Sequence, residues 1–164
     1  MPDMSLTQFI GHLAAFHVRQ QVIMYEAMDR AAALVQREAR REIGAYQNGG
    51  GPFVAWAELA DRTKADRVAQ GFTENDPGLR TGEMRESIGR QVAHNGMQAA
   101  IGSNDDKAVW FELGTSRQPP RSFLGLAAFR EERRIAEIQG RAMATTLVGG
   151  GHRLLPIHES EPLP

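Results

Sequence analysis

The chain has 164 residues, a formal net charge of −1 and no cysteine. This length accommodates about one domain, and the lack of cysteine excludes a disulfide framework, a thiolate zinc site and a cysteine nucleophile. The sequence has no run of about 18 apolar residues, which is the length that could span a membrane. The N-terminus lacks the basic and apolar segments of a secretory signal. We therefore expect a protein that works where it is made, or in a structure assembled there.

Charge is balanced along the chain as well as in total. Residues 1–44 hold 5 basic and 5 acidic side chains, residues 45–102 hold 6 and 7, and residues 103–164 hold 8 and 8. A dedicated DNA-binding protein carries a clustered basic surface, so this balance argues against that function. Arginine supplies 17 of the 19 basic residues, which fits either a protein that uses arginine at its interfaces or a GC-rich genome.

The first 44 residues predict one long helix. Ser5 or Thr7 can cap its start, and Gly44 can close its end. About 38 helical residues measure about 57 Å, which is more than a small domain is wide. The segment therefore either bends near residues 17–21 or projects from the domain. A projecting helix needs a partner that covers its apolar face.

The middle of the chain reads as a loop followed by two helices. The glycine-rich residues 48–52 lack the lysine and hydroxyl of a phosphate-binding loop. Residues 56–70 predict a helix that begins at Trp56, and residues 83–86 predict a short turn or helix. Trp56 fits either a core position or an interface anchor. We assign it to a subunit or partner interface, because tryptophan is enriched at binding hot spots.

Residues 88–101 carry a hairpin signal. Two partly alternating segments flank Asn95-Gly96, the preferred pair for a turn in which both central residues take positive φ. An isolated hairpin is marginally stable in water, so we expect it to pack on helices or join a sheet.

Two further helices are expected after the hairpin. Residues 103–106 form a capping cluster that predicts a helix at 107–113, and the two prolines at 119–120 predict the start of a helix at 120–146, because proline suits the first turn. Their densest apolar residues are the predicted core, which comprises Trp110, Phe111, Leu113, Phe123 and Leu124. Arg117 and Arg121 flank the two prolines, and we expect both to contact a neighbouring chain.

The chain thus divides into a long N-terminal helical segment (1–47), an α+β core domain (53–147) and an extended C-terminal tail (148–164). The tail follows three glycines and carries Leu154, Leu155 and Ile157. It cannot fold alone, so we expect these residues to contact a neighbouring subunit. The predicted fold class is α+β, with a small antiparallel sheet packed by the N-terminal and C-terminal helices.

No motif indicates catalysis or metal binding. His12 and His17 are five residues apart on a helix and so lie on different faces. Neither a Gly-x-Ser-x-Gly nor a Ser-x-x-Lys pattern occurs. We therefore expect a protein that is not an enzyme and that uses no cofactor and no metal.

Four runs between about residues 54 and 130 resemble, in their order and spacing, the neck and tail-completion proteins of tailed bacteriophages. Met84 stands where that family usually has leucine, and Ser122 stands where it usually has a second proline. The four runs are Trp56-Ala57-Glu58-Leu59, Leu79-Arg80-Thr81-Gly82 continuing to Ser87-Ile88, Trp110-Phe111-Glu112-Leu113-Gly114-Thr115, and Gln118-Pro119-Pro120-Arg121-Ser122-Phe123-Leu124. In addition, Ala100-Ile101-Gly102-Ser103 resembles the second hairpin strand of that family.

The resemblance implies a structural virion protein, assembled in the host cytoplasm, that forms a homo-oligomeric ring in the phage neck. Its partners would be itself, the head–tail connector or stopper, and the tail terminator or tail tube proteins, with DNA passing through the lumen and no membrane involved. We add Arg80 to the expected interface. One alternative is a tail terminator or connector ring of the same architecture. A more distant one is an enzyme or a small nucleic-acid-binding regulator.

Overall fold

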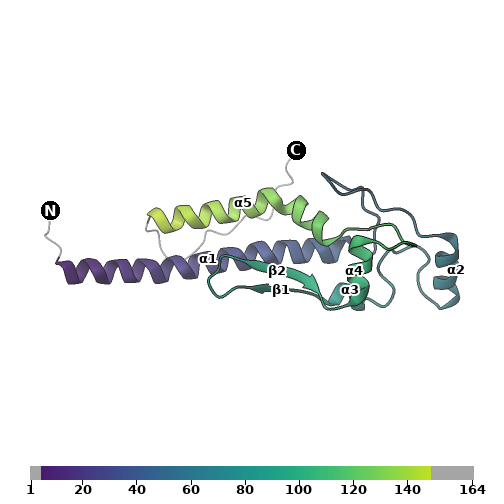
Figure 1. Ribbon diagram of the computed structural model, residues 1–164, viewed down its shortest axis with the longest axis horizontal. Coiled ribbons are helices and arrows are strands. Elements are labelled where there is room, and N and C mark those ends of the chain that lie inside the picture. The colour runs from purple at the N-terminus through teal and green to yellow at the C-terminus, as the bar shows by residue number, and fades with distance from the viewer. Residues whose placement is uncertain (1–4, 149–164) are drawn as a thin grey trace.

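The computed structural model describes residues 5–148. In Figure 1, α1 and α5 lie side by side and run in opposite directions, the β1–β2 hairpin lies along α1, and the short helices gather near the C-terminal end of α1. This arrangement confirms the predicted α+β class. The elements are α1 (Leu6–Glu42), α2 (Asp61–Ala69), α3 (Glu83–Glu86), β1 (Ile88–Val92), β2 (Ala99–Ser103), α4 (Asp106–Leu113) and α5 (Leu124–Val148).

Helix α1 is continuous over 37 residues, without the bend that was one of the two expectations. A reciprocal capping box starts it: the Ser5 hydroxyl accepts from the backbone N–H of Gln8, and the Gln8 side chain accepts from the backbone N–H of Ser5. Ser5 rather than Thr7 is therefore the cap. Gly44 follows the helix with a φ of +104°, which an L-residue adopts only at a cost.

Small residues allow α1 and α5 to approach closely. Ala27 and Ala31 of α1 are buried with Ala142 of α5, and Ile23 and Ile138 fill the remaining space of this cluster. Ile23 is the first buried residue of α1. The part of the helix before it extends beyond the contact with α5 and projects (Figure 1).

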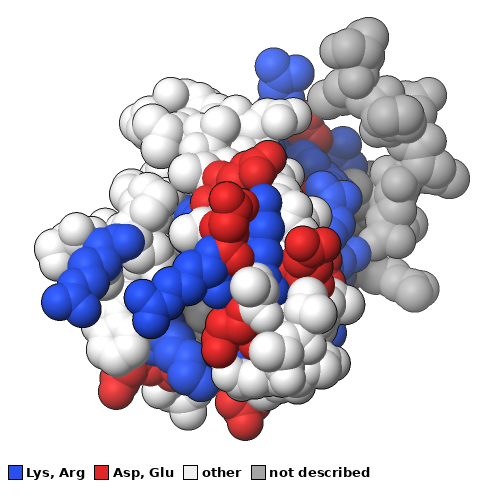
Figure 2. All heavy atoms as spheres, turned by 90° about the vertical axis from the view of Figure 1, so that its right-hand side faces the viewer, with Lys and Arg blue, Asp and Glu red and all other residues white. Residues whose placement is uncertain are grey.

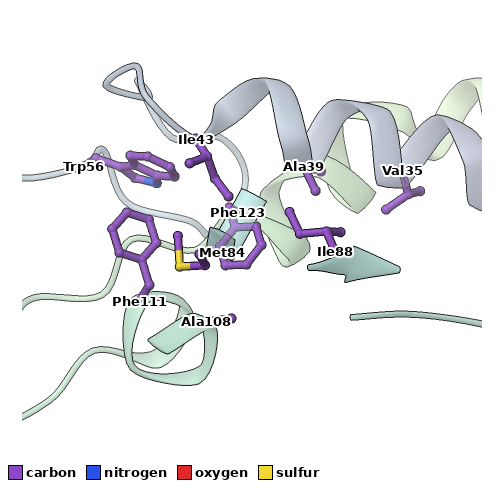
Figure 3. Packing of buried hydrophobic residues seen from close by; sticks show 10 residues of the cluster. Val35, Ala39, Ile43, Trp56, Met84, Ile88, Ala108, Phe111 and Phe123 are labelled. Atoms are coloured by element: carbon purple, nitrogen blue, oxygen red, sulfur yellow. The ribbon is translucent and has the colours of Figure 1, made fainter. Parts of the chain in front are cut away.

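The main core lies where the end of α1 meets the hairpin, α4 and the start of α5. Figure 3 shows Trp56, Phe111 and Phe123 converging with Met84 and Ile43 in this cluster. The Trp56 and Phe111 rings meet edge to face, with centroids 5.2 Å apart, a favoured aromatic geometry. The second half of α1 thus shares one core with the segment that follows it.

The hairpin is confirmed, with Ile88 opposite Ser103 and Val92 opposite Ala99. Its turn differs from the expected type. Gly96 has a φ of +67°, and no residue other than glycine in the described chain has positive φ, so Asn95 is not left-handed. The backbone N–H of Gly96 donates to the carbonyl of Ala93 at 2.9 Å, which builds a longer loop on an ordinary turn.

The expected helix at 56–70 begins five residues late, at Asp61. The segment before it is extended, because its backbone groups bond elsewhere. The backbone N–H of Trp56 donates to the carbonyl of Gln47 at 2.9 Å, and the Arg121 guanidinium donates to the carbonyls of Ala57 and Glu58. A helical turn would need those carbonyls for itself.

Helix α5 also begins later than expected, at Leu124 instead of residue 120. The backbone N–H of Arg121 donates to the carbonyl of Phe111 at 2.8 Å, which fixes residue 121 against α4. The free N–H groups of the first turn of α5 are met by the Glu112 side chain, as described below.

Two of the five predicted core residues are exposed. Phe111 and Phe123 are buried, and Leu124 is partly buried against the same cluster. Trp110 is 55% exposed and Leu113 is 73% exposed, so their assignment to the core was wrong. Helix α4 has only eight residues and turns 100° per residue, so the face that buries Phe111 turns both of these outward.

Candidate interaction surfaces

The first half of α1 carries an apolar stripe that nothing in the described chain covers. Its members are spaced three or four residues apart and therefore share one face of the helix. All are between 40% and 74% exposed. The stripe comprises Leu6, Phe9, Ile10, Leu13 and Phe16.

The apolar stripe is bare because α5 ends before it can reach that far. Near its end α5 also exposes Met143 at 59% and Leu147 at 79%. The part of α1 before Ile23 is about 17 residues and about 26 Å long. An exposed apolar stripe of this kind marks an interaction site, because an apolar helix face binds in a groove or against a second helix.

Glu112 joins α4 to α5. Its carboxylate accepts from the backbone N–H groups of Phe123 at 2.7 Å, Leu124 at 2.9 Å and Gly125 at 3.0 Å, and from the Ser122 hydroxyl. A negative charge at this position meets the positive end of the helix dipole and satisfies otherwise unpaired donors. The Glu of the Trp-Phe-Glu-Leu-Gly-Thr run is therefore a structural cap.

Trp56 and Arg121, both predicted at an interface, are buried inside the chain, at 5% and 4% exposure. The Trp56 indole N–H donates to the carbonyl of Ser122 at 3.1 Å. The Arg121 guanidinium donates to the carbonyls of Ala57 and Glu58, and its burial lowers its pKa. These two predictions were wrong, because both side chains fasten the segment before α2 to the segment before α5.

The other predicted interface residues have different positions. Arg80 is partly exposed, pairs with Asp66 at 2.9 Å and lies over the Phe72 ring. Arg117 is exposed in the turn before Pro119. Both face solvent, and their interface role stays a prediction. Leu154, Leu155 and Ile157 lie outside the described residues.

A pocket of about 390 Å³ opens beside α4, and we call it the arginine pocket. Four of its described lining residues are basic and none is acidic. Figure 2, which views the end of the molecule that carries α2, shows blue basic side chains gathered among red acidic ones. The basic lining residues are Arg67, Arg80, Lys107 and Arg121.

Neither Arg67 nor Lys107 was singled out from the sequence, and Arg67 is the buried one of the two. It is 5% exposed, and its guanidinium donates to the carbonyls of Thr73 at 2.7 Å and Leu79 at 2.6 Å. In a nine-residue helix composed mainly of polar residues, no periodicity distinguishes this arginine from those that face solvent. The signal is tertiary: the loop that follows α2 folds back over it.

A buried carboxyl lies between α1 and α5. Glu42 is 1% exposed and accepts from Arg130 at 2.9 Å through one oxygen, whereas its Oε2 has no hydrogen-bond partner among residues 5–148. Burial raises the pKa of this carboxyl to about 8, against the opposing effect of Arg130. Glu42 does not line the arginine pocket, and its pairing with Arg130 joins α1 to α5.

Within residues 5–148, no group of three or more His, Asp or Glu side chains could hold a metal ion. No helix in that range is long and apolar enough to cross a membrane. Comparison with known proteins adds no relative: no family model, no curated protein and no solved structure matches this chain significantly.

Proposed function

We propose that this chain is a structural subunit of a ring in the neck or tail-completion region of a tailed-phage virion. It acts through protein–protein contacts, with itself and with the connector and tail proteins on either side, and it catalyses no reaction. The apolar stripe of α1 is the observation that carries the proposal. A ring subunit needs a surface on one side that fits the next copy, and the stripe is a projecting surface of that kind.

The order of the motifs in the sequence suggests the family named in this proposal. Three of the runs that carry the resemblance meet at one place in the fold, where Trp56 packs on Phe111 and donates to Ser122. Glu112 of the third run caps the helix that follows the fourth. The resembling residues therefore act as one structural unit, which leaves α1 to reach a neighbour.

The balanced charge supports a role as a conduit for DNA. A strongly basic lumen would hold DNA through many phosphate contacts, whereas acidic and basic side chains are nearly equal in number in residues 1–44, 45–102 and 103–164. We expect weak DNA binding by the isolated protein.

The test compares the assembly state of the wild-type chain with stripe variants. Leu13→Glu puts a charge in the middle of the apolar stripe and should reduce a ring to monomers in light scattering coupled to gel filtration. Val18→Glu is the matched control, because Val18 is 60% exposed but lies on another face of α1. A wild-type chain that stays monomeric, or a Leu13→Glu variant that assembles normally, would contradict the proposal.

The place of the ring in the particle separates the proposal from its nearest alternative. Electron cryomicroscopy of particles carrying the labelled subunit should show density between the connector and the tail. Density at the end of the tail tube or against the portal would identify a terminator or a connector instead.

A further inference from the structure

Two of the four cations that line the arginine pocket have no acidic partner in the described part of the chain. Arg67 and Arg121 bond only to backbone carbonyls and, for Arg67, to the Thr73 hydroxyl. Within residues 5–148 neither has a carboxylate partner, and Nη1 of each makes no hydrogen bond. A buried guanidinium is stabilised best by an anion that takes its fork of donors. An occupant of this pocket should therefore carry a carboxylate or a similar anion.

The rest of the pocket is suited to an apolar group beside that anion. Met84 and Phe111 are both 7% exposed and form part of its lining, and the exposed ring of Trp110 stands at its edge. The exposed cations Arg80 and Lys107 already pair with acidic neighbours on the surface. The combination of apolar lining and free arginine donors fits an acidic peptide segment with apolar side chains.

The chain itself contains such a segment outside the described residues. Residues 157–164 read Ile-His-Glu-Ser-Glu-Pro-Leu-Pro, with two carboxylates and no Lys or Arg. Two prolines restrict its backbone, which lowers the entropy lost on binding. Its charge is opposite to that of the arginine pocket.

The reach of the tail favours a neighbouring copy over the same chain. Helix α5, from Leu124 to Val148, is about 36 Å long, and the pocket lies at its N-terminal end, beside Arg121. The 11 residues from Val148 to Glu159 span at most about 38 Å when fully extended. A chain's own tail would have to run straight back along all of α5.

We infer that the arginine pocket of one copy binds residues 157–164 of a neighbouring copy, with a tail carboxylate on Arg67 and Arg121 and a tail apolar side chain against Met84 and Phe111. This inference rests on the proposed ring and names a second contact within it. The pocket is thus the receptor for a clasp between subunits.

A disulfide trap tests the inference cleanly, because the natural chain has no cysteine. Gln118 lines the pocket, and within the described residues its side chain makes no hydrogen bond, so Gln118→Cys should leave the fold intact. One copy carrying Gln118→Cys is mixed with a tagged copy carrying Leu163→Cys, oxidised mildly and run on a non-reducing gel. Ala136→Cys, an exposed position on α5, replaces Gln118→Cys in the control mixture.

We expect the pocket mixture to give about tenfold more mixed dimer than the control mixture, corresponding to about 1.4 kcal/mol of preference. Adding Glu159→Gln and Glu161→Gln to the tail copy should remove that excess. Equal yields of mixed dimer in the two mixtures would overturn the inference. A yield of mixed dimer that Glu159→Gln and Glu161→Gln leave unchanged would also overturn it. So would a chain with both cysteines that cross-links only within itself, because its own tail would then occupy the pocket.

The masses of the same samples before oxidation separate this inference from the proposed function. Rings without a pocket cross-link contradict the clasp and leave the ring proposal standing. Monomers contradict the ring.

Discussion

The Glu112 cap is the contact through which the structure most sharply explains a sequence motif. Glu112→Gln keeps the shape of the side chain but removes its charge and one of its two acceptor oxygens, while three backbone N–H groups and the Ser122 hydroxyl still point at it. A hydrogen bond to a charged group contributes about 1.5–3 kcal/mol, and a charge at a helix N-terminus about 0.3–1 kcal/mol. We therefore expect a loss of about 2–4 kcal/mol in the free energy of unfolding.

Urea unfolding followed by circular dichroism measures this loss. Glu132→Gln on the exposed face of α5 is the matched control and should change the free energy by less than about 0.5 kcal/mol. A loss below about 0.5 kcal/mol for Glu112→Gln would refute the capping role, since it would mean that water serves the start of α5 equally well.

The remaining predictions concern the core, the hairpin and the buried carboxyl. Phe111→Ala should lower the free energy of unfolding by about 3–5 kcal/mol, whereas Trp110→Ala should change it by less than about 1 kcal/mol, because its ring is exposed; equal losses in urea titrations would reverse our assignment. Gly96→Ala should cost about 1–3 kcal/mol, since a Cβ there would lie 2.7 Å from the backbone of α1, and a stability equal to wild type would show that the loop moves aside. The raised pKa of Glu42, about 8 against an ordinary 4.5, means that the folded state keeps a proton that the unfolded state loses. Stability should therefore fall between pH 4.5 and 8, by at most about 1.4 kcal/mol for each pH unit. Glu42→Gln should flatten this dependence, and an unchanged slope would show that Glu42 is not its source.

Local signals in the sequence correctly predicted the helix and the hairpin whose ends and turn are set by residues close together in the chain. The Ser5 cap, Gly44 and the spacing of apolar residues define α1, and Asn95-Gly96 marks the hairpin even though only Gly96 takes positive φ. The length of α1 predicted either a bend or a projection, and the structure shows the projection. Each of these features rests on interactions between residues that are close in the sequence.

The predictions that were wrong concern residues whose conformation or burial is set by contacts between segments far apart in the sequence. The Arg121 guanidinium donates hydrogen bonds to the carbonyls of Ala57 and Glu58, and these bonds keep residues 56–60 extended despite their helical pattern. Phe111 is buried and Trp110 is exposed because of the way the short helix α4 is rotated about its axis. Two adjacent apolar residues in a sequence do not determine that rotation. Trp56 and Arg121 have the composition of an interface, but they join two segments of one chain about 65 residues apart.

The structure changes the set of residues that are candidates for an interface with a neighbouring subunit. The buried pair Trp56 and Arg121 no longer qualifies. The apolar stripe of α1 takes its place as the surface that we propose for the next subunit. Trp110, removed from the core, becomes part of the edge of the arginine pocket.

The mass of the purified wild-type chain in solution tests the central claim most directly. Sedimentation-velocity ultracentrifugation at micromolar concentration should give one main species whose mass is a whole-number multiple, well above two, of the 18.1 kDa subunit. The Leu13→Glu variant should shift that species to the subunit mass while Val18→Glu leaves it in place. A wild-type protein found only at 18.1 kDa would contradict the account of this chain as a ring subunit.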